Sequence, residues 1–370
     1  MERRDFIKKM AIAATVSSFP SIDILSDTIK GQKENKMIWA NLLHLGTNMW
    51  EDHPYIEGWP VSSQENIHRD DFECKTCQDA LAWGMRGYRP SLVFEDSVWN
   101  TVLQQMKEAG MNMVIIDLGD GVKYESHPEI AVKNAWSVDK LRNELDKIRK
   151  MGLEPIPKLN FATSHDAWLK EYSRMISTKK YYEVCKDLIK EVIELFDTPR
   201  FFHLGMDEET ANHQSTYNYS VIRQHNLWWD DLLFYVNDTE KKGVRSWVWS
   251  DYGWHNPDLF FKKMPKSVLQ SNWYYNAEFD LDKMNDPARS YVKFYNDLEE
   301  YGYDQVPTGS NWSYNTNMES TVEYCRKNID PSRLLGFMTA PWLPTLEQCL
   351  DKHKEAIVQM EDAKKMFENR

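Results

Sequence analysis

Residues 201–209 read Phe-Phe-His-Leu-Gly-Met-Asp-Glu-Glu, a short apolar run that ends abruptly in carboxylates. The apolar part has the length and composition of a buried strand. Carboxylates at the end of such a strand cost free energy unless water, a partner group or a substrate uses them. Because neighbouring residues on an extended chain point to opposite sides, Asp207 and Glu208 are expected to play different parts in one site.

Strand-like and helix-like segments alternate along the rest of the chain. Eight apolar segments are predicted to be strands, at residues 38–46, 112–118, 154–160, 201–205, 244–250, 268–273, 305–310 and 335–340. Each is followed by a segment that is predicted to be helical, at residues 98–109, 138–151, 181–196, 228–241, 259–263, 289–301, 321–328 and 346–367. Eight such units predict an α/β fold, a single (β/α)8 TIM barrel with a long first βα loop. An open doubly wound sheet is the alternative, but no Gly-rich phosphate loop follows a predicted strand.

Active sites of such barrels lie where the strands pass into the following loops. In this chain those positions are rich in polar and aromatic residues, and large rings with a polar edge suit the C–H faces of sugars. We therefore expect an aromatic-walled pocket around Asp207 and Glu208, although most of the Trp and Tyr residues must fill the core. The candidates that line it are Asp120, His165, Trp249, Asp251, Trp273, Tyr274, Trp312 and Trp342.

Net charge and hydropathy indicate which classes of binding partner to expect. The 370 residues include 45 Lys and Arg against 57 Asp and Glu, for a net charge of -12. An acidic surface repels phosphates, so nucleic acid is not expected to bind. No segment after the N-terminal region is apolar enough for a membrane span. Carbohydrate is the expected partner, no metal or other cofactor is expected, and no oligomeric state is predicted.

The N-terminus predicts export. Arg3-Arg4-Asp5-Phe6 precedes a modest apolar run from Met10 to Phe19, and this arrangement resembles a twin-arginine signal that delivers folded proteins across a bacterial inner membrane. We expect a leader at residues 1–30, a catalytic domain at residues 36–370 and a periplasmic location. A basic amphipathic start on a cytoplasmic protein is the alternative.

The five cysteines do not form a disulfide framework or a zinc site. Cys74 and Cys77 are spaced C-x-x-C, but no second pair or paired His completes a metal site. They are expected to be incidental or to form a local disulfide after export. Cys185, Cys325 and Cys349 lie in predicted helices and are expected to pack in the core.

The order of motifs from about Lys107 to Leu343 resembles the catalytic barrel of glycoside hydrolase family 20, the β-hexosaminidases. His203-Leu204-Gly205-Met206-Asp207-Glu208 is similar to that family's strand-four motif, His-x-Gly-Gly-Asp-Glu. Residues 110–117 with His127-Pro128-Glu129 resemble its second strand, and residues 152–165 resemble its third. Residues 243–251, 268–273 and 336–342 are similar to its fifth, sixth and eighth strands.

The resemblance implies a retaining, substrate-assisted mechanism. Glu208 would be the general acid and base, and Asp207 would orient the substrate's 2-acetamido group, whose carbonyl oxygen attacks the anomeric carbon. Residues 305–318, at the predicted seventh strand, contain no Asp or Glu that could serve as a nucleophile. That absence is consistent with a substrate that supplies its own nucleophile. It is equally consistent with an inactive relative, or with a nucleophile elsewhere, such as Asp251 or Glu278. His165 is expected to hydrogen-bond Glu208 and to help set its pKa, which must be raised for an acid that works near neutral pH, unless His165 is a structural loop histidine.

The sequence departs from the family pattern at several points. Met206 replaces the second Gly, Trp342-Leu343-Pro344 lacks the carboxylate of a Trp-x-Glu motif, and the strand-seven Tyr-Leu-Asp is absent. The family's substrate-binding Arg aligns loosely with Arg86 or Arg89. These departures affect the predicted sugar more than the predicted reaction.

Three alternatives to an N-acetylhexosaminidase therefore remain. The first is a glycosidase for a sugar without an acetamido group, and the second is a non-catalytic glycan-binding barrel. The third is a metal-dependent barrel enzyme that uses the acids with His44, His165 or His203, although no clustered carboxylate–His pattern favours it. For His203 a buried core position is preferred, and for residues 207–209 a solvated strand end, with Glu209 as a third surface acid, is the simplest non-functional interpretation.

Overall fold

The computed structural model describes residues 36–54, 87–215 and 217–369. Residues 37–369 of these belong to one compact unit, Met37–Arg370. The predicted leader at residues 1–30 lies outside the described residues, as do Cys74, Cys77 and Arg86.

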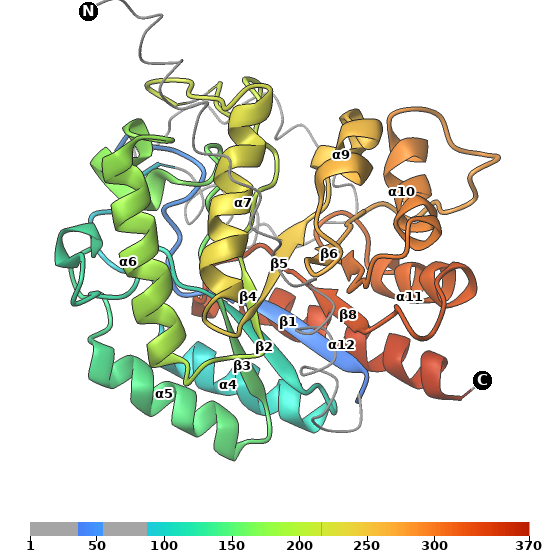
Figure 1. The fold of residues 1–370 in the computed structure, drawn as a ribbon. Helices are drawn as coiled ribbons and strands as arrows, with labels where there is room; N and C mark the ends of the chain where they lie inside the picture. Colours follow the sequence, from blue (N-terminus) through green and yellow to red (C-terminus); the bar gives the residue numbers. More distant parts are fainter. Residues whose placement is uncertain (1–35, 55–86, 216, 370) are drawn as a thin grey trace, which may run out of the picture. The chain divides into compact units, whose positions relative to one another are not determined.

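Eight strands form one parallel sheet, as the sequence predicts (Figure 1). The order across the sheet is β6-β5-β4-β3-β2-β1-β8-β7, so the first and last units of the chain lie side by side. The strands are β1 (Ile38–His44), β2 (Met113–Asp117), β3 (Glu154–Lys158), β4 (Phe201–His203), β5 (Arg245–Trp249), β6 (Leu269–Ser271), β7 (Thr308–Gly309) and β8 (Gly336–Thr339).

The two ends of this sheet meet and close the barrel. The residues around β6 and β7 form parallel bridges between Gln270 and Gln305 and between Trp273 and Thr308. The amide of Thr308 donates a hydrogen bond of 2.9 Å to the carbonyl oxygen of Asn272 across this seam. Pairing at the seam is sparse because β7 is only two residues long. The fold is therefore a nearly closed (β/α)8 barrel. Enzymes with this fold have their active sites at the carboxyl ends of the strands.

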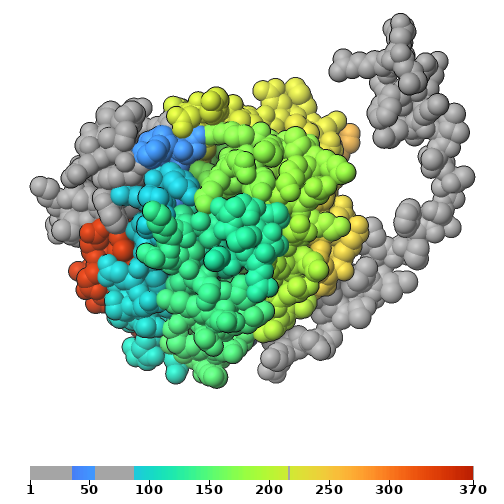
Figure 2. All heavy atoms as spheres, turned by 90° about the vertical axis from the view of Figure 1, so that its left-hand side faces the viewer, coloured from blue at the N-terminus to red at the C-terminus, as the bar shows by residue number. Residues whose placement is uncertain are grey.

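Helices follow the strands around the outside of the barrel, and the cyan and green segments of the second to fourth units form one outer face (Figure 2). Each long helix turns an apolar stripe inward, and Ser137 and Thr178 cap the starts of α5 and α6 with their side-chain oxygens. The α-helices are α4 (Asp96–Glu108), α5 (Val138–Lys150), α6 (Lys179–Leu195), α7 (Asn226–Glu240), α8 (Tyr252–His255), α9 (Pro257–Lys263), α10 (Ala288–Glu300), α11 (Asn317–Asn328) and α12 (Leu350–Glu368), with short 3-10 turns at Pro128–Ile130, Ala167–Arg174 and Glu347–Cys349.

Two apolar clusters hold this arrangement together. The larger lies between the helices and the outer face of the sheet, and it contains buried rings such as Trp99, Trp136 and Trp229. The smaller lies inside the barrel and includes Trp247 and Trp249. Most of the large aromatic side chains are thus core residues, as expected. Cys185, Cys325 and Cys349 are also buried, which confirms their predicted packing role.

A row of titratable residues crosses the barrel interior at the carboxyl ends of β1, β2 and β3. His44, Asp117 and Lys158 are register neighbours on β1, β2 and β3, and each is at most 1% exposed. Lys158 forms an ion pair with Asp117, and His44 Nδ1 lies 3.5 Å from the same carboxylate oxygen. Burial alone would raise the pKa of Asp117, but Lys158 and His44 outweigh it and lower that pKa. The carboxylate therefore stays ionised inside the barrel.

No helix among the described residues is both long and apolar enough to cross a membrane.

We predict that Asp117→Asn will lower the free energy of unfolding by roughly 3–5 kcal/mol, because the Lys158 charge would stay buried without its partner. Urea denaturation measures the change. Asp297→Asn, which breaks the exposed pair with Lys293, is the control and should cost less than about 1 kcal/mol. Equal effects of the two substitutions would show that the buried row does not stabilise the barrel.

Candidate active site

The predicted acids lie at the carboxyl edge of the barrel, immediately after β4. The strand ends at His203 because the next residues leave the extended conformation: φ is 71° at Gly205, 75° at Met206 and 55° at Glu208. Positive φ is unfavourable for Met and Glu, and such strain is found where a surrounding structure fixes it, often at functional sites. The turn brings the Asp207 and Glu208 side chains to the same imidazole.

Gly205 cannot carry a side chain at this turn. A Cβ there would lie 2.0 Å from Asn160 Oδ1. Asn160 follows β3, and its Nδ2 donates a hydrogen bond of 2.8 Å to Asp207 Oδ1. The glycine therefore admits the residue that orients Asp207.

His165 bridges the two acids. Its Nε2 lies 3.3 Å from Asp207 Oδ2 and 3.2 Å from Glu208 Oε2. The His165 side chain is only 4% exposed, and its Nδ1 is buried without a hydrogen-bond partner. The predicted contact between His165 and Glu208 is confirmed, and it extends to Asp207.

Asp251 supports Glu208 from the end of β5. Its Oδ2 accepts a hydrogen bond of 2.8 Å from the backbone N–H of Glu208. Its other oxygen, Oδ1, is buried without a hydrogen-bond partner. The predicted site residue Asp251 therefore belongs to the cluster, and it holds the strained backbone of Glu208.

A second histidine, His213, contacts Glu208 from the other side. Its Nε2 lies 3.4 Å from Glu208 Oε1, while its Nδ1 is 2.9 Å from Thr210 Oγ1. Sequence reasoning missed this residue because it lies in a loop without a recognisable motif. The only sequence signal was its position five residues after the acid.

These contacts set the ionisation of Glu208. Burial raises its pKa, but hydrogen bonds from His165 and His213 outweigh that effect and lower it below its ordinary value. Burial lowers the pKa of His165, yet the charges and hydrogen bonds of Asp207 and Glu208 outweigh it and raise that pKa to about 10. The expectation that Glu208 has a raised pKa is wrong for this arrangement, because two histidines stabilise its ionised form.

Within this cluster, Asp251 is the carboxyl group whose pKa lies near neutrality. Burial first, and the charge of Asp207 second, raise the pKa of Asp251 to about 7. Three carboxyl groups and two histidines thus share a small number of protons, and the cluster behaves as one coupled unit.

Glu209 is not a surface acid. Its side chain is 4% exposed and forms an ion pair of 2.6 Å with the fully buried Arg223. Arg223 also contacts Asp231 of α7 at 3.0 Å and donates to the carbonyl oxygen of Phe161 at 2.6 Å. Arg223 therefore ties the loops after β3 and β4 to α7.

Aromatic rings form one wall beside the acids. Trp342, half-buried with φ of 56°, lies 5.8 Å from the ring of Trp249 and 6.5 Å from that of Trp50. The Trp50 ring lies 6.1 Å from the ring of His165. Trp249 and Trp342 are therefore placed near the acids as predicted. Trp50 belongs to the start of the long first loop, which thus reaches the site.

Tyr275, rather than Tyr274, lies near the acids, in the segment that follows β6. The Tyr275 ring stacks on Trp273 at 5.0 Å, and burial first, then the charges of Glu208, Asp207 and Asp251, raise the pKa of Tyr275. The predicted Tyr274 instead packs in the core against Phe279, 5.2 Å between ring centroids. The choice between the two was wrong by one residue because adjacent side chains of an extended segment point in opposite directions.

The remaining candidates have their contacts with residues other than Asp207 and Glu208. Asp120 is buried and accepts a hydrogen bond of 2.7 Å from Asn48 of the first loop, and burial raises the pKa of Asp120 to about 7. Trp312 is half-buried after β7, where its amide donates to Ser310 Oγ. Glu278, one alternative nucleophile, is exposed and accepts from the amide of Asp280. His203 is buried and accepts from the amide of Gly205, as expected for a core histidine.

One group of described residues is close enough to hold a metal ion. One ligand atom from each of His165, Asp207 and Glu208 lies within 4.8 Å of the others. These atoms are already joined by the two ion pairs of His165, whose positive charge offsets the carboxylates. We therefore interpret the group as an acid–base cluster, and activity in the presence of EDTA tests the metal-dependent alternative.

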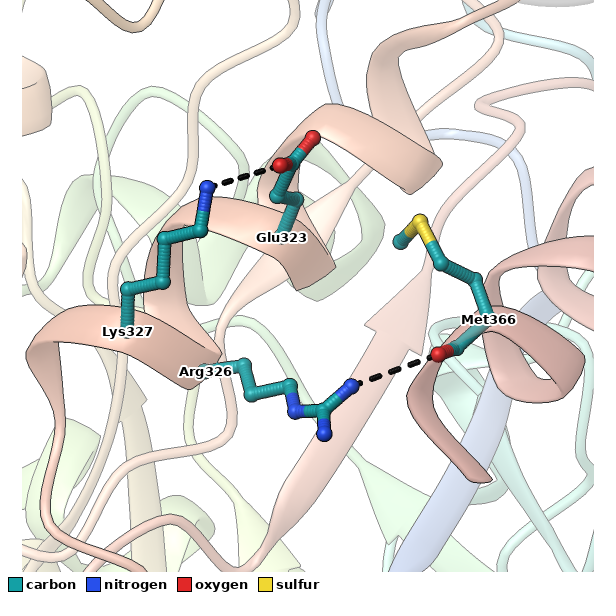
Figure 3. Close-up of a pocket in the computed structure, with 4 residues that line it drawn as sticks. All are labelled: Glu323, Arg326, Lys327 and Met366. Carbon is teal, nitrogen blue, oxygen red and sulfur yellow. Dashed lines mark hydrogen bonds and ion pairs between the residues drawn. The ribbon is translucent and has the colours of Figure 1, made fainter. Parts of the chain in front are cut away.

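A cavity lies away from these acids, between α11 and α12 (Figure 3). It has a volume of about 240 Å³ and is lined by Glu323, Arg326, Lys327 and Met366. Lys327 pairs with Glu323 within α11, and Arg326 donates to the carbonyl oxygen of Met366. These charges already have partners, and barrel enzymes place their chemistry at strand ends, so we do not assign the active site here.

Comparison with solved structures identifies proteins of the same fold. An exo-β-N-acetylglucosaminidase of glycoside hydrolase family 20 from Vibrio harveyi aligns with a TM-score of 0.50 and 13% identity, over 71% of this chain and 51% of that chain. The β-N-acetylhexosaminidase of Bacteroides fragilis aligns with a TM-score of 0.50 and 12% identity, over 86% and 65%. The N-acetyl-β-hexosaminidase of Streptomyces plicatus gives 0.51 and 11%, over 71% and 60%.

This chain aligns with about half the length of the first two matching structures. No family model matches the sequence, and no curated protein matches it. At this level of identity the alignments show a shared fold. The resemblance to glycoside hydrolase family 20 is thus confirmed for the architecture of the barrel.

We predict that Glu209→Gln lowers the free energy of unfolding by roughly 3 kcal/mol, because it removes a charge that Arg223 needs inside the protein. Glu154→Gln, which weakens the exposed pair with Arg200, is the control and should cost less than about 1 kcal/mol. Chemical denaturation of both variants measures the difference. Equal costs of the two substitutions would show that the buried pair does not stabilise the protein.

A pH dependence follows from Asp251. Because its pKa is about 7 in the folded state and 3.8 in a model peptide, the folded protein binds its proton more tightly between these values. This contribution to stability is therefore present at pH 4 and is lost as the pH rises to 7. Asp251→Asn should flatten that part of the curve of unfolding free energy against pH. Parallel curves for the two proteins would contradict the assignment.

Proposed function

We propose that this protein is a glycoside hydrolase that removes a terminal N-acetylhexosamine. The observation that carries the proposal is the position of Asp207 and Glu208, which follow β4 of a (β/α)8 barrel and share His165. Glycosidases of family 20 have the same barrel, and two of the matching structures are described as N-acetylglucosaminidase or hexosaminidase.

Glu208 is proposed as the general acid and base. Its side chain is the more exposed of the two acids, at 27% against 8% for Asp207, so it is the acid that a leaving group reaches. It would donate a proton to the glycosidic oxygen as the bond to the anomeric carbon breaks. In the second half of the reaction its carboxylate would take a proton from the attacking water, which restores the acid.

Asp207 is proposed to orient the substrate's acetamido group. Two carboxylates of a nucleophile–acid pair flank the sugar, whereas Asp207 and Glu208 contact one imidazole nitrogen and therefore lie on the same side. Asp251 is committed to the backbone of Glu208, and residues 305–318 supply no carboxylate. These features favour attack by the acetamido oxygen, which forms a bicyclic oxazolinium ion that water then opens.

The aromatic residues near the acids support a sugar as the ligand. Trp342, which packs against the buried Trp249, offers a ring face beside the cluster, as do Trp273 and Tyr275, which follow β6. Such faces match the C–H surface of a pyranose or the methyl group of an acetamide. The twin-arginine-like start of the sequence supports export to the periplasm as part of the same proposal.

Hydrolysis of aryl glycosides tests this proposal. We expect release of nitrophenol from the N-acetyl-β-glucosaminide or N-acetyl-β-galactosaminide and none from the plain glucoside or galactoside. Glu208→Gln should lower kcat by about 10²–10⁴-fold for a poor leaving group, the usual contribution of a general acid.

Three other results have distinct meanings. Activity on the plain sugars alone would contradict the acetamido mechanism but keep the glycosidase. Binding of N-acetylglucosamine without turnover, unchanged in Glu208→Gln, would indicate a glycan-binding barrel. Loss of activity with EDTA that added metal restores would favour the metal-dependent alternative.

A further inference from the structure

The proposed reaction needs a protonated Glu208, yet Glu208 is ionised in the arrangement seen here. Hydrogen bonds from both histidines keep the pKa of this carboxyl below its ordinary value despite burial. The proton must therefore be held nearby and must return to Glu208 when a substrate displaces water from the site. Two groups contact the Glu208 oxygens, His165 at Oε2 and His213 at Oε1.

His165 is poorly suited to release its proton. It is 4% exposed, and its Nε2 is shared between Asp207 and Glu208. Removal of this proton would leave the Asp207 charge without a partner in a buried site, which is costly. His165 is therefore expected to stay charged throughout.

His213 has the opposite character. Its side chain is 31% exposed and contacts only one carboxylate of the cluster, Glu208. Its proton can exchange with solvent, and its loss leaves Asp207 paired with His165. Burial lowers the pKa of His213, but the hydrogen bond and charge of Glu208 outweigh it and raise that pKa, with a smaller increase from Asp251 and a decrease from His165.

The loop holds His213 in this position from both sides. Thr210 Oγ1 accepts the backbone N–H of His213 at 3.3 Å and contacts its Nδ1 at 2.9 Å. The next residue, Gln214, is buried and donates to Thr163 Oγ1 at 3.0 Å and to the carbonyl oxygen of Val221 at 2.8 Å. His213 is thus anchored beside Glu208 while one edge of its ring meets solvent.

We propose that His213 stores the catalytic proton of Glu208 between turnovers. This role rests on the proposed glycosidase activity and deepens it. When substrate expels water, the proton passes from His213 Nε2 to Glu208 Oε1, and the ion pair becomes a neutral pair. Glu208 gives that proton to the leaving oxygen and then takes a proton from the attacking water. On product release this proton passes from Glu208 back to His213. His213 is a positioning residue, since it acts through Glu208.

The pH profile and the leaving group distinguish this role from a structural one. In the wild type, kcat/KM should hold until the pH exceeds the raised pKa of His213. In His213→Asn the fall of kcat/KM at alkaline pH should begin at least ~1 pH unit lower, because Glu208 must then take its proton directly from solvent. At pH 7 the loss should be at least ~10-fold for a poor leaving group and small for 2,4-dinitrophenyl, which needs no acid.

Control variants distinguish proton storage from a general effect on the loop. His225 is an exposed residue at the end of the same loop, and His225→Asn should leave both the pH profile and the leaving-group dependence unchanged. Thr210→Val, which removes the contact to Nδ1, should shift the profile in the same direction by a smaller amount. Circular dichroism confirms that each variant is folded.

Titration of His213 by NMR gives a readout that does not depend on turnover. We expect its pKa to lie above 6.5 in the wild type and to fall in Glu208→Gln. An ordinary His213 titration, or an unchanged alkaline limb in an active His213→Asn enzyme, would overturn this role and leave the proposed function intact. A wild-type chain that hydrolyses none of the glycosides would overturn both.

Discussion

The buried ion pair between Arg223 and Glu209 is the interaction on which the site depends. Three of the five residues from Gly205 to Glu209 have a positive φ, and a strained turn persists only if its surroundings fix it. Arg223 fixes its far end, with contacts to Glu209, to Asp231 of α7 and to the loop after β3. Asn160 and Asp251 fix its near end and its middle. The strain at Glu208 is therefore offset by polar contacts on all sides.

The same contacts explain the electrostatics of the cluster. Carboxyl groups in a buried site repel one another, and each needs a cation or a proton. His165 supplies a positive charge to Asp207 and Glu208, and Asp251 keeps a proton close to neutrality. His213 provides the one contact of Glu208 with a partly exposed base. A site of this kind can change the location of a proton without a change in its total charge, which suits an acid that must be ionised at rest and protonated with substrate.

Periodic apolar segments were sufficient to predict the barrel, because eight strand–helix units leave few other arrangements. The motif at residues 201–208 and the segment at residues 152–165 also predicted the contact between Glu208 and His165. The sequence could not reveal that Glu209 is buried, since its partner Arg223 lies fourteen residues away on a loop. It could not find His213, which has no motif, and it chose Tyr274 where Tyr275 lies near the acids. It also gave the wrong direction for the pKa of Glu208, because that direction depends on side-chain distances across loops.

Asp207 and Glu208 are proposed to act on a substrate whose own acetamido oxygen attacks its anomeric carbon. A thiazoline made from N-acetylglucosamine is a stable copy of the bicyclic ion in that reaction. Isothermal titration calorimetry should show that the wild type binds it at least ~100-fold more tightly than N-acetylglucosamine, as expected for an analogue of a reactive intermediate. Asp207→Asn should lose most of this preference. Equal affinities of the wild type for the two ligands would contradict the account.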